Sequence, residues 1–195
     1  MKLDIVISGV GGQGILTIAG LLAQAALQQG WNVKQSEIHG MAQRGGAVEA
    51  NLRLSQAPIF SDLIARGTAD AICAMEPLEA LRYLPMLKPE GWVLTSSDPV
   101  ASIHNYPALD VLQAELEQLP HRVLLPAGQM AKDAGSNRAA NMVMLGALSA
   151  LTPFPTTVFE SIITHQFKGK GDAVVAANLK AFAAGRQAST SVIKI

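Results

Sequence analysis

The 195-residue sequence predicts a single α/β domain with three α/β/α layers, in which helices cover both faces of a Rossmann-like, mostly parallel sheet. Short apolar runs alternate with longer segments of helical periodicity, and a glycine-rich loop joins the first run to the first helix. Hydrophobic residues make up 49% of the chain and charged residues only 15%, as expected for a well-filled core. We therefore expect one domain over residues 1–186, followed by a loose C-terminal tail over residues 187–195.

The first part of the chain supplies a strand, a helix and two further strands. Residues 3–8 form an apolar strand interrupted only by Asp4, and the helix that follows ends near Gly30. Its apolar residues recur at helical spacing: Ile15, Ile18, Ala19, Leu22 and Ala26. A second strand begins over residues 31–35. Residues 47–54 alternate between apolar and polar side chains, which predicts either a sheet edge or a strand with one wet face.

The remaining elements continue the alternation. The expected strands cover residues 69–75, 92–95 and 123–125, and a helix begins at Pro77 and runs towards Leu87. Three further helices are expected over residues 137–151, 156–167 and 172–185. The first of these three is apolar nearly all round, so we expect it to be buried.

The glycine loop has the spacing G-x-G-x-x-G between a strand and a helix, which is typical of phosphate binding at a helix N-terminus. The candidate cofactor-binding residues there are Gly9, Gly11, Gly12, Gln13 and Gly14. Glu37 follows about 20 residues later, where a ribose-binding acid is expected in a dinucleotide fold. A dinucleotide, another phosphate-bearing group and close packing against a neighbouring subunit are all compatible with this loop.

Residues 36–46 place an acid, an imidazole, an amide and a guanidinium among three glycines. We expect this segment to lie beyond the carboxyl end of the second strand, beside the glycine loop. The candidate catalytic residues are Glu37, His39 and Arg44, and Gln43 is a further binding candidate. Arg44 is suited to a carboxylate or phosphate, and His39 to proton transfer near neutral pH. The alternative is a glycine-rich connector whose polar side chains bind the backbone.

Several function classes are excluded by composition and spacing. The formal net charge is zero, so nothing indicates nucleic-acid binding. The four histidines are too far apart in sequence for a metal site, and one cysteine, Cys73, cannot hold an iron–sulfur cluster. The apolar stretch of the first helix is too short to span a bilayer, and no signal peptide is evident, so we expect a cytoplasmic protein.

Polar residues at two further helix starts are candidates for ligand contacts. Glu76 ends a buried strand and precedes Pro77, where helix capping explains it equally well. Asn137, Arg138 and Asn141 open an otherwise apolar helix, and they suit either a ligand, a partner or a helix cap.

Three groups of residues carry a resemblance to a known family: residues 11–14, residues 36–46, and residues 76–83 with Lys88-Pro89. They closely resemble the gamma-type domain of 2-oxoacid:ferredoxin oxidoreductases, above all the small (beta) subunits of its indolepyruvate-dependent members. The likeness continues through residues 141–146 and 178–182. It implies an α/β/α subunit of an enzyme that decarboxylates an aryl 2-oxoacid oxidatively, forms an acyl-CoA and reduces ferredoxin.

The resemblance also implies a division of labour. Thiamine diphosphate, Mg and [4Fe-4S] clusters are expected on a large partner subunit, with CoA as co-substrate. This chain lacks a G-D-G segment, since Gly171-Asp172 is followed by Ala173. We expect it to be inactive alone, and a homodimer is compatible with the isolated chain. A stand-alone NAD(P)-dependent oxidoreductase and a non-catalytic scaffold subunit are the alternatives.

Overall fold

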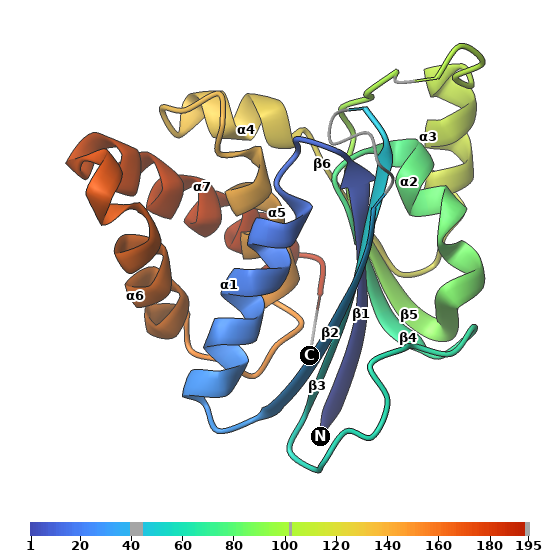
Figure 1. Cartoon of the computed structure of the whole chain (residues 1–195). Helices are drawn as coiled ribbons and strands as arrows, with labels where there is room; N and C mark the ends of the chain where they lie inside the picture. The colour runs from blue at the N-terminus through green and yellow to red at the C-terminus, as the bar shows by residue number, and fades with distance from the viewer. Residues whose placement is uncertain (40–44, 102, 194–195) are drawn as a thin grey trace.

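A six-stranded sheet forms the centre of the computed structural model, which describes residues 1–39, 45–101 and 103–193 (Figure 1). The strand order is β2-β3-β1-β4-β5-β6. The strands are β1 (Lys2–Val10), β2 (Asn32–His39), β3 (Ala47–Ser55), β4 (Ala69–Ala74), β5 (Leu87–Ser96) and β6 (Arg122–Leu125). All six lie where the sequence predicts a strand.

The sheet is mixed because one strand runs against the others. Strands β1, β4, β5 and β6 pair in parallel, whereas β3 is antiparallel to both β1 and β2. Since β3 lies between β2 and β1, the sheet-edge interpretation of residues 47–54 is wrong. The alternation itself is confirmed, since Leu52 and Leu54 are buried on one face. The other face is polar but not open to solvent, because Glu49 and Arg53 are half-buried and Asn51 is only 3% exposed.

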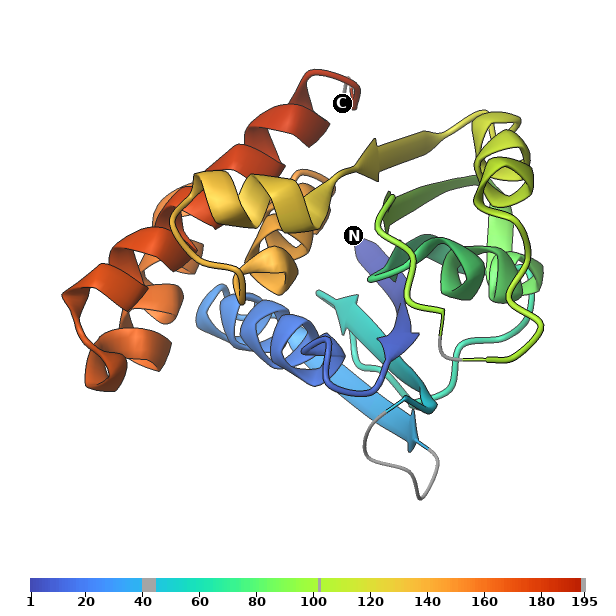
Figure 2. The same cartoon turned by 90° about the horizontal axis from the view of Figure 1, so that it is seen from above.

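Helices cover both faces of the sheet, as expected for three layers (Figures 1 and 2). One layer contains α1 (Ile15–Gln28), α4 (Ala127–Asp133), α5 (Ala140–Ser149), α6 (Thr156–Phe167) and α7 (Asp172–Thr190). The opposite layer contains α2 (Pro77–Arg82) and α3 (Leu109–Glu117). Short 3-10 turns follow α2 and α6, η1 (Leu84–Met86) and η2 (Lys168–Lys170).

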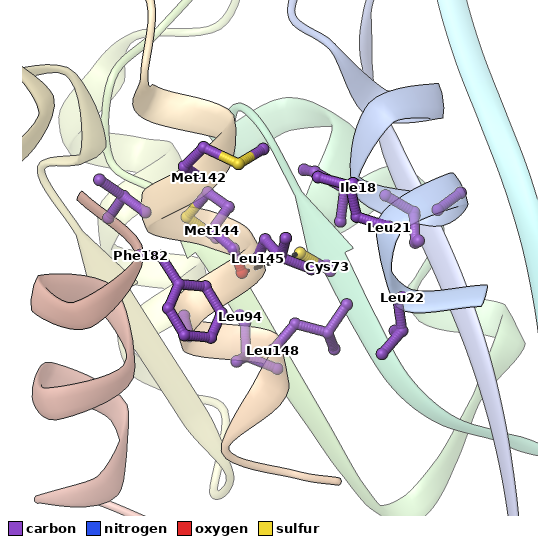
Figure 3. Close-up of a cluster of buried hydrophobic side chains, with 14 of the residues drawn as sticks. Ile18, Leu21, Leu22, Cys73, Leu94, Met142, Met144, Leu145, Leu148 and Phe182 are labelled. Carbon is purple, nitrogen blue, oxygen red and sulfur yellow. Dashed lines mark hydrogen bonds between the residues drawn. The ribbon is translucent and has the colours of Figure 1, made fainter. Parts of the chain in front are cut away.

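The main core lies between the sheet and the α1 layer, with α5 at its centre (Figure 3). All residues of α5 from Met142 to Ser149 are buried, which confirms the expectation from its apolar sequence. Gly146 and Gly185 allow α5 and α7 to touch, because a Cβ atom at either position would overlap the backbone of the other helix. Cys73 packs in this core, and burial raises the pKa of its thiol to about 12.

Several boundaries differ from the sequence prediction. The helix that begins at Pro77 ends at Arg82 instead of near Leu87, because a 3-10 turn follows it and β5 already begins at Leu87 instead of residue 92. Strand β2 continues past Gln35 to His39, because its pairing with β3 extends that far. Helix α5 begins at Ala140 instead of residue 137. The loose tail expected from Gln187 is wrong, since α7 continues to Thr190 and Ile193 is buried in the main core.

Candidate functional site

The sheet has a topological switch point where β1 and β4 end side by side. Helix α1 leaves β1 towards one face of the sheet, and α2 leaves β4 towards the other face (Figure 1). Connections that diverge in this way open a crevice at the carboxyl ends of the strands. The glycine loop of residues 9–14 lies at this point, so the predicted binding loop is in the position where open α/β sheets bind ligands.

The glycine loop combines tight turns with an uncapped helix start. Gly12 and Gly14 adopt left-handed φ values of 101° and 82°, which only glycine accommodates without strain. Gly14 is the N-cap of α1, and no side chain caps the first amides of that helix. The loop therefore presents donors and the positive end of the helix dipole.

Gln13 ties the loop to the neighbouring strand. The amide N–H of Val10 donates to Gln13 Oε1 at 2.6 Å, and Gln13 Nε2 donates to the carbonyl of Met75 at 3.1 Å. Both polar ends of the side chain are thus engaged within the chain. Although Gln13 lines the crevice, its side chain is used to hold the ends of β1 and β4 together.

Two of the motif glycines are also required for packing. A Cβ atom at Gly9 would lie 2.9 Å from Cβ of Met75, and one at Gly14 would lie 2.5 Å from Nδ2 of Asn141. Close packing therefore accounts for part of the motif. The contacts are with Met75, directly after β4, and with α5 of the same chain, so the glycines do not need a neighbouring subunit to explain them.

A cleft of about 640 Å³ opens from the glycine loop towards α4 and the start of α5. Lys132 and Arg138 are its cationic residues, and both are exposed. Neither forms an ion pair with another residue in the described ranges. The other lining residues are Gly12, Gln13, Met75, Ser96, Asp98, Gly128, Gln129, Asn137, Ala140 and Asn141. Two unpaired cations beside an uncapped helix start favour an anionic ligand.

The one acid of this cleft is already engaged. Asp98 Oδ2 accepts a hydrogen bond from Ser96 Oγ at 3.0 Å and another from the amide of Gly128 at 2.6 Å. These bonds anchor the first turn of α4 to the end of β5. Asp98 therefore positions the helix that carries Lys132.

The second predicted segment is placed only in part. The end of the β2–β3 hairpin adjoins the glycine loop, because the amide of Gly11 donates to the carbonyl of Gly46 at 2.8 Å. His39 pairs with Val48 in the sheet. Its side chain, and Gln43 and Arg44, lie outside the described residues.

Glu37 does not occupy the place of a ribose-binding acid. It is exposed on β2, where Oε1 accepts a hydrogen bond from Gln35 Nε2 at 2.6 Å. In a dinucleotide fold the acid ends the strand beside β1. Here β3 lies between β2 and β1, so the sheet order separates Glu37 from the glycine loop.

Buried acids lie on the α2 side of the crevice. Glu76 is 1% exposed; its Oε1 accepts from the amide of Glu79 and its Oε2 from Tyr106 Oη at 2.5 Å. The sequence left a ligand contact and helix capping open for Glu76, and its bond to the amide of Glu79 is a helix cap. Burial, and next the hydrogen bond to Glu76, raise the pKa of Tyr106. Burial raises the pKa of Glu79, the charge of Arg82 opposes this, and the charge of Glu76 adds to it.

Only some of the residues that line the cleft were predicted from the sequence. Asn137, Arg138 and Asn141 were candidates, and they line it. Lys132 and Asp98 also line the cleft and were not predicted. The polar residues that follow the apolar run of β5 are a signal for Asp98, because strand ends meet at the crevice. Lys132 has no such signal, since its helix is placed by packing.

Neither a metal site nor a membrane span is evident in the part of the chain that the structure describes. No group of three or more His, Cys, Asp or Glu side chains there is arranged to hold a metal ion. No helix among those residues combines the length and hydropathy needed to cross a bilayer.

Comparison with known proteins identifies relatives along nearly the whole chain. The family model for pyruvate ferredoxin/flavodoxin oxidoreductase matches residues 4–188. The indolepyruvate oxidoreductase subunit IorB of Archaeoglobus fulgidus is 40% identical over 194 residues, which cover 95% of this chain and 94% of that protein.

Two solved structures share the fold. The gamma subunit of a keto/oxoacid ferredoxin oxidoreductase from Geobacter sulfurreducens matches 97% of this chain and 99% of its own, with a TM-score of 0.71 and 28% identity. The 2-oxoglutarate:ferredoxin oxidoreductase of Magnetococcus marinus, with 2-oxoglutarate, coenzyme A and succinyl-CoA bound, has a TM-score of 0.79 and 25% identity. The match covers all of this chain and 32% of that one.

Proposed function

We propose, because this chain belongs to the pyruvate ferredoxin/flavodoxin oxidoreductase family, that it is the small subunit of a 2-oxoacid:ferredoxin oxidoreductase of the indolepyruvate type. The enzyme decarboxylates an aryl 2-oxoacid, transfers the acyl group to CoA and passes the electrons to ferredoxin. The near-complete match to an indolepyruvate oxidoreductase subunit supports this substrate class.

A larger subunit supplies the reactive groups in this proposal. Thiamine diphosphate, Mg and iron–sulfur clusters are assigned to it because the donors of this chain do not fit them. Cys73 is the only cysteine and is fully buried, so it cannot ligate a cluster. The proposed role of this chain is then to bind and position CoA and the 2-oxoacid at the site that it shares with the larger subunit. We assign the assembly to the cytoplasm.

The cleft beside the glycine loop is proposed to hold the phosphate groups of CoA. The observation that carries this role is the pair of unpaired cations, Lys132 and Arg138, facing an uncapped helix start across a cleft of about 640 Å³. Charge-assisted hydrogen bonds from ammonium and guanidinium groups are strong contacts for phosphate oxygens. Gln13 and Asp98 hold the walls of the cleft in place.

The segment after β2 is proposed to complete the site of the larger subunit. Arg44 would bind the carboxylate of the 2-oxoacid, with Gln43 beside it, and His39 would hold or move a proton there. The bond between Gly11 and Gly46 supports this role, since it keeps the end of the hairpin against the glycine loop. Glu37, which is exposed on the edge strand β2, is proposed as a further catalytic residue of this shared site.

Reconstitution tests the subunit assignment. The chain is combined with the purified larger subunit, and indolepyruvate- and CoA-dependent reduction of ferredoxin or a viologen dye is followed. We expect turnover only when both chains are present, and a raised KM for indolepyruvate in Arg44→Ala. Unchanged kinetic constants in that variant would remove Arg44 from the site. Turnover by the larger subunit alone would contradict the assignment.

The two alternatives make different predictions. An NAD(P) oxidoreductase requires a dinucleotide site, and the separation of Glu37 from the glycine loop by β3 argues against one. Quenching or enhancement of NADH fluorescence by the isolated chain would favour it. A scaffold subunit requires that His39→Ala reduces assembly and leaves the activity of the assembled enzyme unchanged.

A further inference from the structure

One face of the sheet is left without a helix where β2 and β3 pair. Helix α2 packs on β1, β4 and β5, whereas α1 contacts β2 and β3 from the opposite face. Cross-strand partners share a face, so three pairs line this open area. They are Lys34 with Arg53, Ser36 with Asn51, and Ile38 with Glu49. The loop between β3 and β4 passes over this area (Figures 1 and 2), and the side chain of Tyr83, which follows α2, hydrogen-bonds Glu49 at its end.

This loop is held rigidly by one arginine. Arg53 Nε and Nη2 donate to the two carboxylate oxygens of Asp4 at 2.9 and 3.1 Å. Its Nη1 donates to the carbonyls of Ser61 and Leu63 at 2.9 and 3.1 Å. Asp4 is 1% exposed, so the guanidinium is anchored to the sheet before it reaches the loop. The backbone of residues 61–63 is therefore fixed in position.

The fixed loop exposes large apolar side chains. Phe60 is 96% exposed and Leu63 is 63% exposed, and Ile38 on β2 is 58% exposed. Ser36 Oγ donates to the carbonyl of Asp62 at 3.4 Å, which brings the loop to the same side of β2 as Ile38. We call Phe60, Leu63 and Ile38 the Phe60 surface. Grouped apolar exposure of this kind marks interaction sites, and a fixed backbone lowers the entropy lost on binding.

The neighbouring elements indicate which partner covers this surface. Ile38 leads directly into the segment that the proposed function places against the larger subunit. In the Magnetococcus marinus protein, the region like this chain is only 32% of a longer polypeptide, so this fold occurs there next to a larger body.

We propose that the Phe60 surface docks on the larger subunit, with Phe60 as an anchor in an apolar pocket of that partner. This inference rests on the proposed function, since it requires that a larger subunit exists. Arg53, bound to Asp4, holds the backbone next to Phe60 in position; we call this pair the Arg53 clamp.

The test compares two exposed apolar residues on the same side of the sheet. Phe60→Asp alters the proposed anchor, and Val111→Asp alters α3 at a residue that is 53% exposed. The affinity of each full-length variant for the purified larger subunit is measured by titration calorimetry, together with turnover of the mixture. We expect Phe60→Asp to weaken binding by a factor of about ten or more, as for an interface anchor. Val111→Asp should bind as the wild type does, and both should keep the wild-type melting temperature.

The outcomes separate the two proposals. If the wild-type chain binds the larger subunit and Phe60→Asp binds equally well, the docking surface is wrong while the function stands. If Phe60→Asp only abolishes self-association in sedimentation experiments, the surface joins two copies and the inference is again overturned. If the wild-type chain does not bind the larger subunit, the proposed function itself fails.

Discussion

The two faces of the sheet are built in different ways. On the α1 side, five helices cover the strands, and the apolar core includes residues from Leu3 to Ile193. On the α2 side, a smaller apolar cluster lies between the helices α2 and α3 and the strands β1, β4 and β5, and the Arg53–Asp4 ion pair lies over β3. The α1 side therefore holds the larger core, whereas the α2 side combines a smaller core with the exposed Phe60 surface.

Strand β3 shows the difference within one element. Ala50, Leu52 and Leu54 are completely buried against the α1 side. Asn51 and Arg53 point to the other side, where Arg53 neutralises the buried Asp4. Within β3, close packing stabilises the first face and a few polar partners stabilise the second.

The largest effect is expected from removing the polar anchor. Arg53→Ala leaves the carboxylate of Asp4 buried with only Lys2 at 2.8 Å, so we expect a loss of about 3–5 kcal/mol in the free energy of unfolding, measured in urea. Lys2→Ala is the matched control. The Lys2 side chain is 53% exposed, so its removal should cost about 1 kcal/mol or less. Equal losses in the two variants would show that the α2 side does not depend on the Arg53 clamp.

A smaller effect is expected from overfilling the apolar side. In Gly185→Ala the new methyl group would meet the backbone of Val143, so α5 and α7 must move apart. Overpacking of this kind typically costs about 1–3 kcal/mol. Gly169→Ala has no heavy atom within 4 Å of the new Cβ and serves as the control. If thermal unfolding shows both variants to be as stable as the wild type, the contact between the two helices is not close.

The smallest effects are expected from pH, and they belong to the α2 side. Burial disfavours the charged form of Asp4, but hydrogen bonds from Arg53 and Lys2 outweigh it and lower the pKa of Asp4. Its contribution to stability is therefore present above the ordinary value of 3.8 and is lost as pH falls through the lowered pKa. Glu79 has a raised pKa, so its contribution is present below 4.5 and is lost as pH rises through the raised pKa.

Unfolding measured against pH separates these two carboxyl groups. Asp4→Asn should flatten the acidic limb, and Glu79→Gln should flatten the decline above pH 4.5. An acidic limb that persists in Asp4→Asn would assign the pH dependence to other groups.

The apolar side was the more predictable of the two. Residues 156–167 form α6 as expected, and the alternation of residues 47–54 identified the buried side of β3. These signals are local, because helix and strand periodicities are written in consecutive residues. The continuation of α7 past Gln187 was not predicted, since Ala188 and Ile193 pack on a core formed by residues distant in the sequence.

The cleft was less predictable because it is assembled from separate elements. The glycine loop is recognisable from its sequence spacing. Lys132 and Asp98, however, line the cleft from α4 and from the end of β5. The order of strands in the sheet decides which of these ends meet. For the same reason Glu37 was grouped with the glycine loop, although β3 lies between their strands.

The most direct test of the proposed role is the KM for CoA in the reconstituted enzyme. The variants are Lys132→Ala and Arg138→Ala, and Lys168→Ala on η2 is the control for loss of one exposed charge. We expect each cleft variant to raise the KM for CoA by a factor of about ten, the equivalent of about 1.4 kcal/mol, without a change in the KM for indolepyruvate. A KM for CoA that matches the Lys168→Ala control in both cleft variants would contradict a phosphate site beside the glycine loop.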